Sequence, residues 1–253
     1  KDTLDALHEA RKFGSQISSI CNVIGSTIAR LTGNGAYLHA GPEFAVASTK
    51  VFSNMIAAGL LFSLTISEIP EKEQRSIVQE LRKLPNILSS QLSDLDDSIL
   101  EAAKIIIDSE PPIFIGRGGL SSYLAKEGAL KMMEISYIPC LSMPGGELKH
   151  GPIALISKDS PVIAIAPTDS KLQLMESSIR ECKSRGARII LITDNEGPIT
   201  DLADILIQTN TTLPDLSPFV NIIPIQLLAY HVGVLKGVNV DRPRNLAKSV
   251  TVV

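Results

Sequence analysis

The chain has 253 residues, of which 44% are hydrophobic and 20% charged, and its formal net charge is −3. This composition supports a buried core and excludes general disorder. The mild acidity, without a cluster of Lys and Arg, excludes a nucleic-acid-binding protein. No apolar run reaches the ~20 residues of a membrane span. We therefore expect a cytoplasmic protein that binds small molecules and neither nucleic acid nor membrane.

The three cysteines, Cys21, Cys140 and Cys182, are far apart, and none belongs to a CxxC pair. A sparse, odd set is typical of a reducing compartment. It argues against a disulfide framework and against a zinc site.

Residues 1–70 predict a mixture of helices and short strands. Apolar residues at helical spacing predict a helix from Leu4 to Phe13, which Gly14 ends. Short strands are predicted at 16–23 and 36–39, and a long apolar helix at 45–64.

The polar, amphipathic stretch 71–107 predicts helices that bridge two units, with an interruption at Pro85. Beyond it, strands alternate with helices, which predicts parallel sheets in a doubly wound α/β arrangement. The strands are expected at 112–115, 161–166, 187–193 and 204–208, and the helices at 120–136, 171–185 and 217–237.

A faint internal repeat accompanies this pattern. Gly14 precedes Asn22 at the same spacing as Gly186 precedes Asp194, and a predicted strand lies between the members of each pair. Two copies of one α/β unit would explain the similarity, although αβ units also resemble one another in general.

The predicted strand at 112–115 leads into the glycine-rich turn at 116–119. Ser121 holds the third glycine place of a dinucleotide fingerprint, so the turn does not match that motif. A tight strand–helix turn is the simpler interpretation.

Glu127, Lys131 and Glu134 are four and three residues apart, which places them on one face of the predicted helix. The rest of that helix is apolar or small, as in a buried helix. Two carboxylates and an ammonium on a buried helix suit proton transfer. Spacing alone favours the alternative, a solvated ladder of salt bridges.

Two further residues carry chemistry that the sequence leaves open. His150 lies in a glycine-bounded loop, and histidine is a common acid–base residue, but an exposed loop histidine without a role is the common case. Lys248 lies in a polar tail, where a lysine either forms a Schiff base or belongs to a solvated basic end.

Four strings together resemble one family. They are EGALK with EISY at 127–137, GELKHGP at 146–152, PRNLAKSVTV at 243–252 and VASTK at 46–50. The chain resembles, from end to end, the isomerase (SIS) part of glutamine–fructose-6-phosphate aminotransferase (isomerising), also called glucosamine-6-phosphate synthase.

The resemblance implies an α/β fold of two SIS-type doubly wound units, with parallel sheets flanked by helices. The first unit, in 1–70, is expected to be truncated at its amino end. Residues 71–110 would form bridging helices, 111–237 the second SIS unit, and 238–253 a C-terminal active-site tail.

The reaction implied is the conversion of fructose 6-phosphate and ammonia to glucosamine 6-phosphate by Schiff-base formation and a 1,2-hydrogen shift. The family takes the ammonia from glutamine in a glutaminase domain, which this sequence lacks, and uses no metal or organic cofactor. It works as a homodimer with a shared active site.

Residue by residue, Glu134 resembles the enolising base, and His150 the ring-opening residue that the partner subunit supplies. Lys248 resembles the Schiff-base lysine, and Lys131 a helper in proton transfer. Positions similar to those that touch the sugar are Val46, Ser48 and Ala247.

The sequence also departs from the family. The phosphate-gripping Ser-Gln-Ser loop would precede Lys1, and the segment 139–145 lacks the usual His and Glu. We therefore expect a piece of a longer enzyme or a decayed copy. Other SIS phosphosugar isomerases or deglycases, and a non-catalytic sugar-phosphate sensor, are the alternatives.

Overall fold

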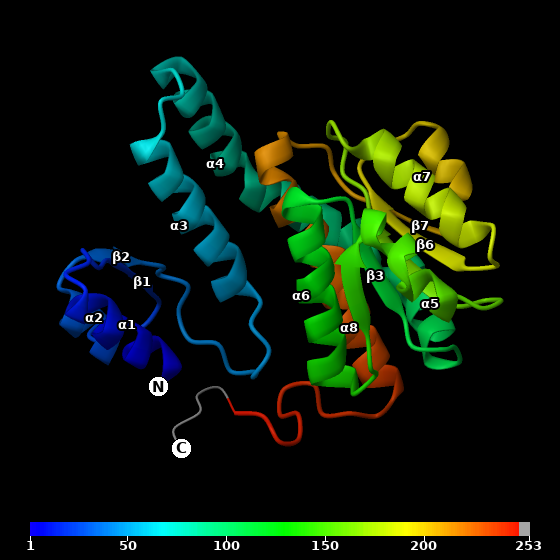
Figure 1. Cartoon of the computed structure of the whole chain (residues 1–253), viewed down its shortest axis with the longest axis horizontal. Coiled ribbons are helices and arrows are strands. Elements are labelled where there is room, and N and C mark those ends of the chain that lie inside the picture. The colour runs from blue at the N-terminus through cyan, green and yellow to red at the C-terminus, as the bar shows by residue number, and fades with distance from the viewer. Residues whose placement is uncertain (248–253) are drawn as a thin grey trace. The chain divides into compact units, whose positions relative to one another are not determined.

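The computed structural model describes residues 1–247, and the chain divides into two compact units (Figure 1). Unit 1 comprises Lys1–Gln74 together with the chain from Arg244, and unit 2 comprises Arg75–Pro243. Both units are built on parallel strands accompanied by helices, which confirms the predicted fold class.

Unit 1 contains a small parallel sheet in which β1 pairs with β2. A short helix between these strands escaped the sequence prediction. The Ser26 side chain accepts the Ala29 N–H at its start, and Gly33 ends it at a φ of 69°. Six residues are too few to show a helical period. The elements are α1 (Asp2–Lys12), β1 (Ser19–Cys21), α2 (Thr27–Thr32), β2 (Gly35–Tyr37) and α3 (Lys50–Ile66).

The helix α4 (Glu71–Asp94) continues through Pro85, so the predicted interruption there was wrong. The break falls instead at Leu95, before α5 (Asp96–Ile107). A proline inside a helix loses one hydrogen bond. Burial of Ile77, Leu84 and Gln91 along one side of α4 outweighs that loss.

Unit 2 holds a five-stranded parallel sheet in the order β4-β3-β5-β6-β7. The chain passes from β3 outward to β4 and then back across to β5. This reversal is the type of point at which open α/β sheets bind ligands, outside the carboxyl ends of the strands. The strands are β3 (Ile113–Gly116), β4 (Leu141–Pro144), β5 (Pro161–Ile165), β6 (Arg188–Thr193) and β7 (Ile205–Gln208).

Strand β4 is the one strand of unit 2 that the sequence analysis missed. It is short, ends in Pro144 and lies at the edge of the sheet, half-exposed. An edge strand with a proline lacks the continuous apolar run that marks the inner strands β3 and β5.

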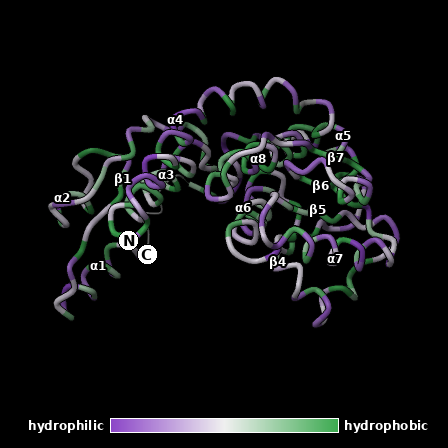
Figure 2. The backbone as a smooth tube through the Cα atoms, turned by 90° about the horizontal axis from the view of Figure 1, so that it is seen from above, coloured by the Kyte–Doolittle hydropathy of each residue, from purple (hydrophilic) through white to green (hydrophobic). Residues whose placement is uncertain are grey.

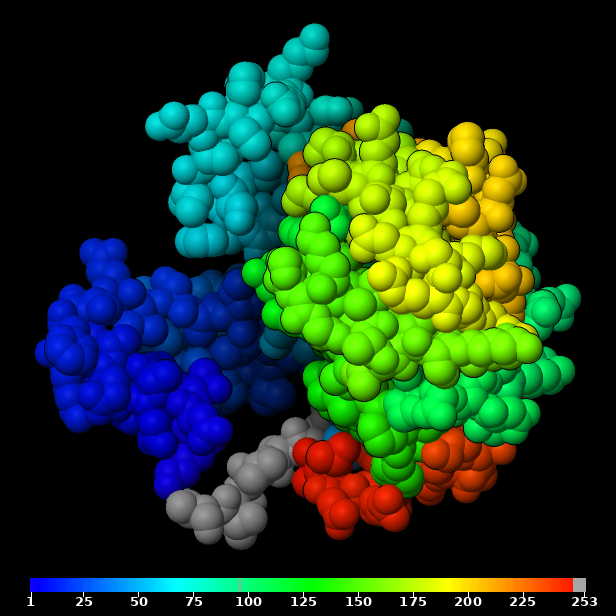
Figure 3. Space-filling view, turned by 45° about the vertical axis from the view of Figure 1, so that its right-hand side comes forward, coloured from blue at the N-terminus to red at the C-terminus, as the bar shows by residue number. Residues whose placement is uncertain are grey.

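Helices cover both faces of this sheet (Figure 2). On one face pack α5, α6 (Gly119–Ser136) and α8 (Ser217–Leu235), and on the other α7 (Leu172–Lys183). Figure 3 shows the outer side of α7, in yellow-green, on the surface of unit 2. Four short 3₁₀ helices complete the unit: η1 (Gly145–His150), η2 (Pro152–Leu155), η3 (Pro198–Leu202) and η4 (Pro214–Leu216).

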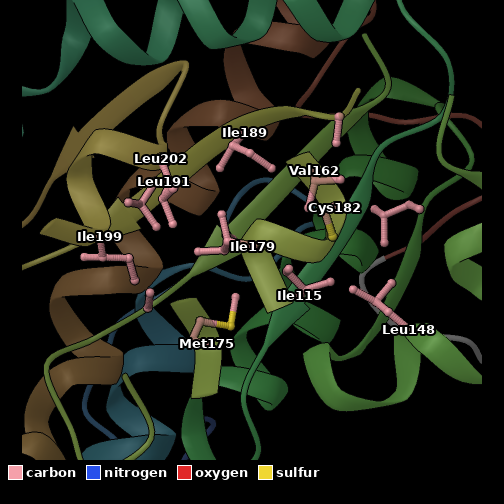
Figure 4. Packing of buried hydrophobic residues seen from close by; sticks show 14 of the residues in the cluster. Ile115, Leu148, Val162, Met175, Ile179, Cys182, Ile189, Leu191, Ile199 and Leu202 are labelled. Carbon is pink, nitrogen blue, oxygen red and sulfur yellow. The ribbon is translucent and has the colours of Figure 1, made fainter. Parts of the chain in front are cut away.

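The core follows the alternation of side chains along each strand. Ile115 and Val162 join the cluster under α7, with Met175 and Ile179 of that helix (Figure 4). Phe114, between Ile113 and Ile115, points to the other face, where its ring lies against Gly128 of α6.

Among the described residues, one helix, Pro214–Leu235, is long and apolar enough to cross a membrane. The expectation that no segment reaches this length was therefore wrong. Most of the helix is buried inside the unit, where α8 packs against α5 and α6. Its apolar character serves this packing, because a helix buried on most sides is apolar on most sides.

The contact between α6 and the sheet predicts the effect of adding one methyl group. A Cβ at Gly128 would lie 2.7 Å from the Phe114 ring and 3.0 Å from Ile225. Gly128→Ala should therefore destabilise unit 2 by about 1–3 kcal/mol through overpacking, measured by urea unfolding.

Gly59→Ala in α3 is the matched control, because a Cβ there meets no atom within 4 Å. It should stabilise by roughly 0.5–1 kcal/mol, since alanine favours a helix over glycine. Equal shifts of the same sign for both variants would contradict the packing described.

Candidate active site

In the turn between β3 and α6, backbone N–H groups donate hydrogen bonds to two serine hydroxyls at the start of α6. The Ser121 hydroxyl accepts the Arg117 N–H at 3.0 Å, and the Ser122 hydroxyl accepts the Gly118 N–H at 2.7 Å. A Cβ at Gly116 would lie 2.3 Å from the Ser121 backbone, so glycine is required there. The turn therefore matches the simpler interpretation, a tight strand–helix connection.

The helix that follows places Lys131 between two carboxylates. The Lys131 ammonium lies 2.6 Å from Glu134 Oε2 and 3.3 Å from Glu127 Oε1. The side chain of Lys131 is 6% exposed, that of Glu127 15% and that of Glu134 21%. The ladder of solvated salt bridges that spacing alone favoured is therefore wrong, because the central charge is out of water.

This arrangement is suited to proton transfer. The Lys131–Glu134 contact is a short, charge-assisted hydrogen bond. The pair brings a proton donor and a carboxylate base together, and Glu134 keeps enough exposure for a ligand to reach it.

His150 is exposed and ends the 3₁₀ helix η1, where the sequence analysis expected an open loop. Leu148, 0% exposed, anchors η1 in the core under α7. At the start of η1, Arg117 Nη1 donates to Ser178 Oγ at 2.8 Å. A Cβ at Gly146 would lie 2.9 Å from that guanidinium, so the turn lies directly on the Arg117–Ser178 pair.

The remaining candidates belong to unit 1 or lie beyond the described residues. Val46 and Ser48, both half-buried, precede α3 in unit 1, and Ala247 is exposed near the end of the chain. Lys248 lies outside the described residues. The structure thus brings Lys131 and Glu134 into direct contact within unit 2.

A residue near Ser48 was missed by the sequence analysis. Glu43 accepts hydrogen bonds from Ser48 and from two backbone amides at the start of α3. An acidic residue just before a predicted helix is a recognisable signal, since carboxylates stabilise helix N-termini. The sequence analysis did not use this signal. It started the helix at Ala45, so Ser48 was placed inside the helix and not in the segment that Glu43 holds.

The segment that departs from the resembled family lines a cavity at the amino ends of two strands of unit 2. Pro139, Cys140 and Leu141 border a cavity of about 260 Å³, together with Ile113 and Leu155. Ile113 and Leu141 are the first residues of their strands, so the cavity lies at the amino ends, away from the carboxyl edge. Among the residues that the structure describes, no group of His, Cys, Asp and Glu could hold a metal ion.

Comparison with known proteins identifies the class. The model of the SIS domain matches residues 1–64 and 105–236, and the chain belongs to the SIS domain family.

Within that family, the chain is similar to curated glutamine–fructose-6-phosphate aminotransferases. The chain is 42% identical over 256 residues to glutamine–fructose-6-phosphate aminotransferase [isomerizing] of Bacteroides thetaiotaomicron, and 43% identical over 255 residues to that of Chlorobaculum tepidum. In both cases the match covers 99% of this chain and 41% of the relative, so the chain spans about two fifths of the length of these relatives.

A solved structure agrees. The C-terminal domain of glucosamine-fructose-6-phosphate aminotransferase from Francisella tularensis superposes with a TM-score of 0.89 at 35% identity. The superposition covers 95% of this chain and 69% of that one. The resemblance drawn from the four sequence strings is therefore confirmed.

The burial of the cysteines makes a testable prediction. Burial raises the pKa of the Cys140 thiol to about 12. Burial, with a smaller effect of Glu181, raises the pKa of Cys182 to about 11, against a lowering by Arg185. At pH 8 the Cys140 side chain is therefore held as the thiol, and the thiolate is the reactive form.

Alkylation of Cys140 by iodoacetamide should therefore be at least ~100-fold slower in the folded protein than in guanidinium, as followed by peptide mass spectrometry. Cys140→Ala identifies its peptide. Equal rates in the folded and unfolded protein would show that the thiol is not desolvated as described.

Proposed function

We propose that this chain is the isomerase part of a glutamine–fructose-6-phosphate aminotransferase. It would convert fructose 6-phosphate and ammonia to glucosamine 6-phosphate and water, with the ammonia released from glutamine in a separate glutaminase domain. The observation that carries the proposal is the Lys131 ammonium held between Glu127 and Glu134 on α6. The names of the relatives supply the substrate.

In the proposed reaction, His150 opens the sugar ring and exposes the C2 ketone. The Lys248 amine then adds to C2 and water leaves, which forms a Schiff base. Ammonia displaces the lysine, so that the nitrogen ends on the sugar.

The hydrogen shift follows from this imine. Glu134 takes a proton from C1, and a proton is returned at C2, which converts the ketose imine to a 2-amino aldose. Lys131 helps by donating a hydrogen bond to the Glu134 carboxylate.

The parts of the chain have separate tasks in this proposal. Residues 1–70 and the tail 238–253 contact the sugar through Val46, Ser48 and Ala247, the helices of 71–110 bridge, and 111–237 supply the base. A cytoplasmic homodimer with a shared site would bring His150 from the partner subunit. The exposure of His150 supports this, since the side chain is available to a second protein surface.

A non-catalytic sugar-phosphate sensor is less well supported. The buried Lys131 is paired with Glu134, which remains accessible as a base. A protein that only binds a sugar phosphate needs no base. An isomerase that does not aminate would retain the base, so the nature of the product separates these functions.

The proposal predicts the loss of proton transfer without Glu134. In the intact protein, Glu134→Gln keeps the shape of the side chain but removes the base. We expect isomerisation of fructose 6-phosphate to glucose 6-phosphate, and formation of glucosamine 6-phosphate, to fall at least ~100-fold. Both are measured by coupled assay.

Glu176→Gln is the control, because Glu176 pairs with Arg180 on the surface of α7. It should retain wild-type rates. Unchanged turnover in folded Glu134→Gln would refute the assignment of the base.

The Schiff base makes a separate prediction. In the intact protein, Lys248→Ala should abolish trapping of fructose 6-phosphate by borohydride, because no amine remains to form the imine. Lys248→Arg should also fail, although it keeps the charge. Covalent adducts are detected by intact-mass spectrometry.

Lys236→Ala, at the exposed end of α8, should trap normally. Full trapping in Lys248→Ala would move the Schiff base to another lysine, with Lys131 the next candidate.

A further inference from the structure

The segment that carries Ser48 is tied to a single carboxylate. Glu43 Oε1 accepts the Thr49 N–H at 2.9 Å and the Val51 N–H at 3.2 Å. The same oxygen lies 3.4 Å from Ser48 Oγ, whose hydroxyl donates to it. All of these groups belong to unit 1.

These bonds replace an ordinary helix cap. The first four N–H groups of a helix lack partners within the helix. Thr49, the residue before α3, forms no capping hydrogen bond with its own side chain. The carboxylate of Glu43, six residues earlier, satisfies this end instead and opposes the positive end of the helix dipole.

Apolar packing contributes little at the start of this segment. Phe44, next to Glu43, is 93% exposed. The preceding stretch is fixed by other polar contacts: Asn22 donates to the Gly41 carbonyl at 2.7 Å, and Asn54 donates to the Leu38 carbonyl at 3.0 Å. The Glu43 bonds thus continue a polar framework that ends at Ser48.

The contact with Glu43 also sets the direction of the Ser48 hydroxyl. A serine hydroxyl has one proton to donate and two lone pairs, whereas a carboxylate can only accept. Once the Ser48 proton is directed at Glu43, the oxygen is left as an acceptor. This orientation favours a ligand group that donates to Ser48, such as a sugar hydroxyl, over a phosphate or carbonyl oxygen.

We propose that Glu43 is a positioning residue for the sugar, which holds Ser48 and the first turn of α3 and makes the Ser48 hydroxyl an acceptor for a sugar hydroxyl. This inference rests on the proposed function, in which Ser48 contacts fructose 6-phosphate. Glu43 acts through Ser48 and takes no part in proton transfer.

The test uses the intact protein and compares Glu43→Ala, Glu43→Gln and the control Glu68→Gln, an exposed acid of the same unit. Glu43→Ala removes every bond and should raise the KM for fructose 6-phosphate at least ~10-fold, while kcat changes less than ~3-fold. Glu43→Gln retains an acceptor oxygen and should restore most of the affinity. Glu68→Gln should behave as wild type.

Coupling to Ser48 separates this role from a general structural one. In a Ser48→Ala background, Glu43→Ala should raise KM clearly less than it does alone, because the hydroxyl that it orients is gone. A merely structural role would lower the unfolding midpoint and the active fraction, leave KM unchanged and show no coupling. If Glu43→Ala does not fold, Glu43→Asp takes its place in the cycle, because its shorter side chain withdraws the carboxylate from Ser48 while keeping the charge.

The outcomes distinguish the two proposals. Wild-type protein that turns over fructose 6-phosphate, with Glu43 variants equal to Glu68→Gln, overturns the role of Glu43 alone. Wild-type protein that neither binds fructose 6-phosphate by calorimetry nor converts it overturns the proposed function, and this inference with it.

Discussion

The burial of one positive charge constrains much of unit 2. Lys131 lies on α6, which packs on the sheet, and an ammonium at 6% exposure is costly without partners. Glu127 and Glu134 supply these partners from the same helix, one turn before and one turn after. Removing one partner of such a buried pair typically costs about 3–5 kcal/mol, so the charges and the packing of α6 depend on each other.

The close approach of α6 to the sheet makes this burial possible. Gly128, one residue from Glu127, lets the helix lie against Phe114 of β3 and Ile225 of α8. A larger residue would move the helix outward and carry the three charged side chains toward water. The apolar α8, which resembles a membrane span by composition, packs against α6 along this contact.

In unit 1, too, a carboxylate binds several groups at once. Glu43 satisfies backbone amides at the start of α3 and reaches the Ser48 hydroxyl, so one side chain both caps a helix and orients a candidate ligand contact. In unit 2 the corresponding task at the start of α6 falls to the Ser121 and Ser122 hydroxyls, which turn inward to the glycine-rich turn. The two helix starts therefore have different polar surroundings, although both units share one fold class.

The sequence by itself determined the fold class, the inner strands and the long helices. Their signals are local: continuous apolar runs for β3, β5 and β6, and helical periodicity for α1 and α7. It also determined that Glu127, Lys131 and Glu134 share a face, because helical spacing alone requires this.

Only the tertiary structure decided which elements override their local signals. Pro85 lies inside α4 because buried contacts along the helix outweigh one lost hydrogen bond. Edge strand β4 forms because β3 offers it a partner, although its own residues carry little strand signal. The burial of Lys131 likewise depends on the packing of α6. The hydrogen bond between Ser48 and Glu43 depends on the conformation of the loop before α3. The exposure of a side chain, and its contacts with residues distant along the chain, depend on the whole fold and cannot be predicted from a local pattern.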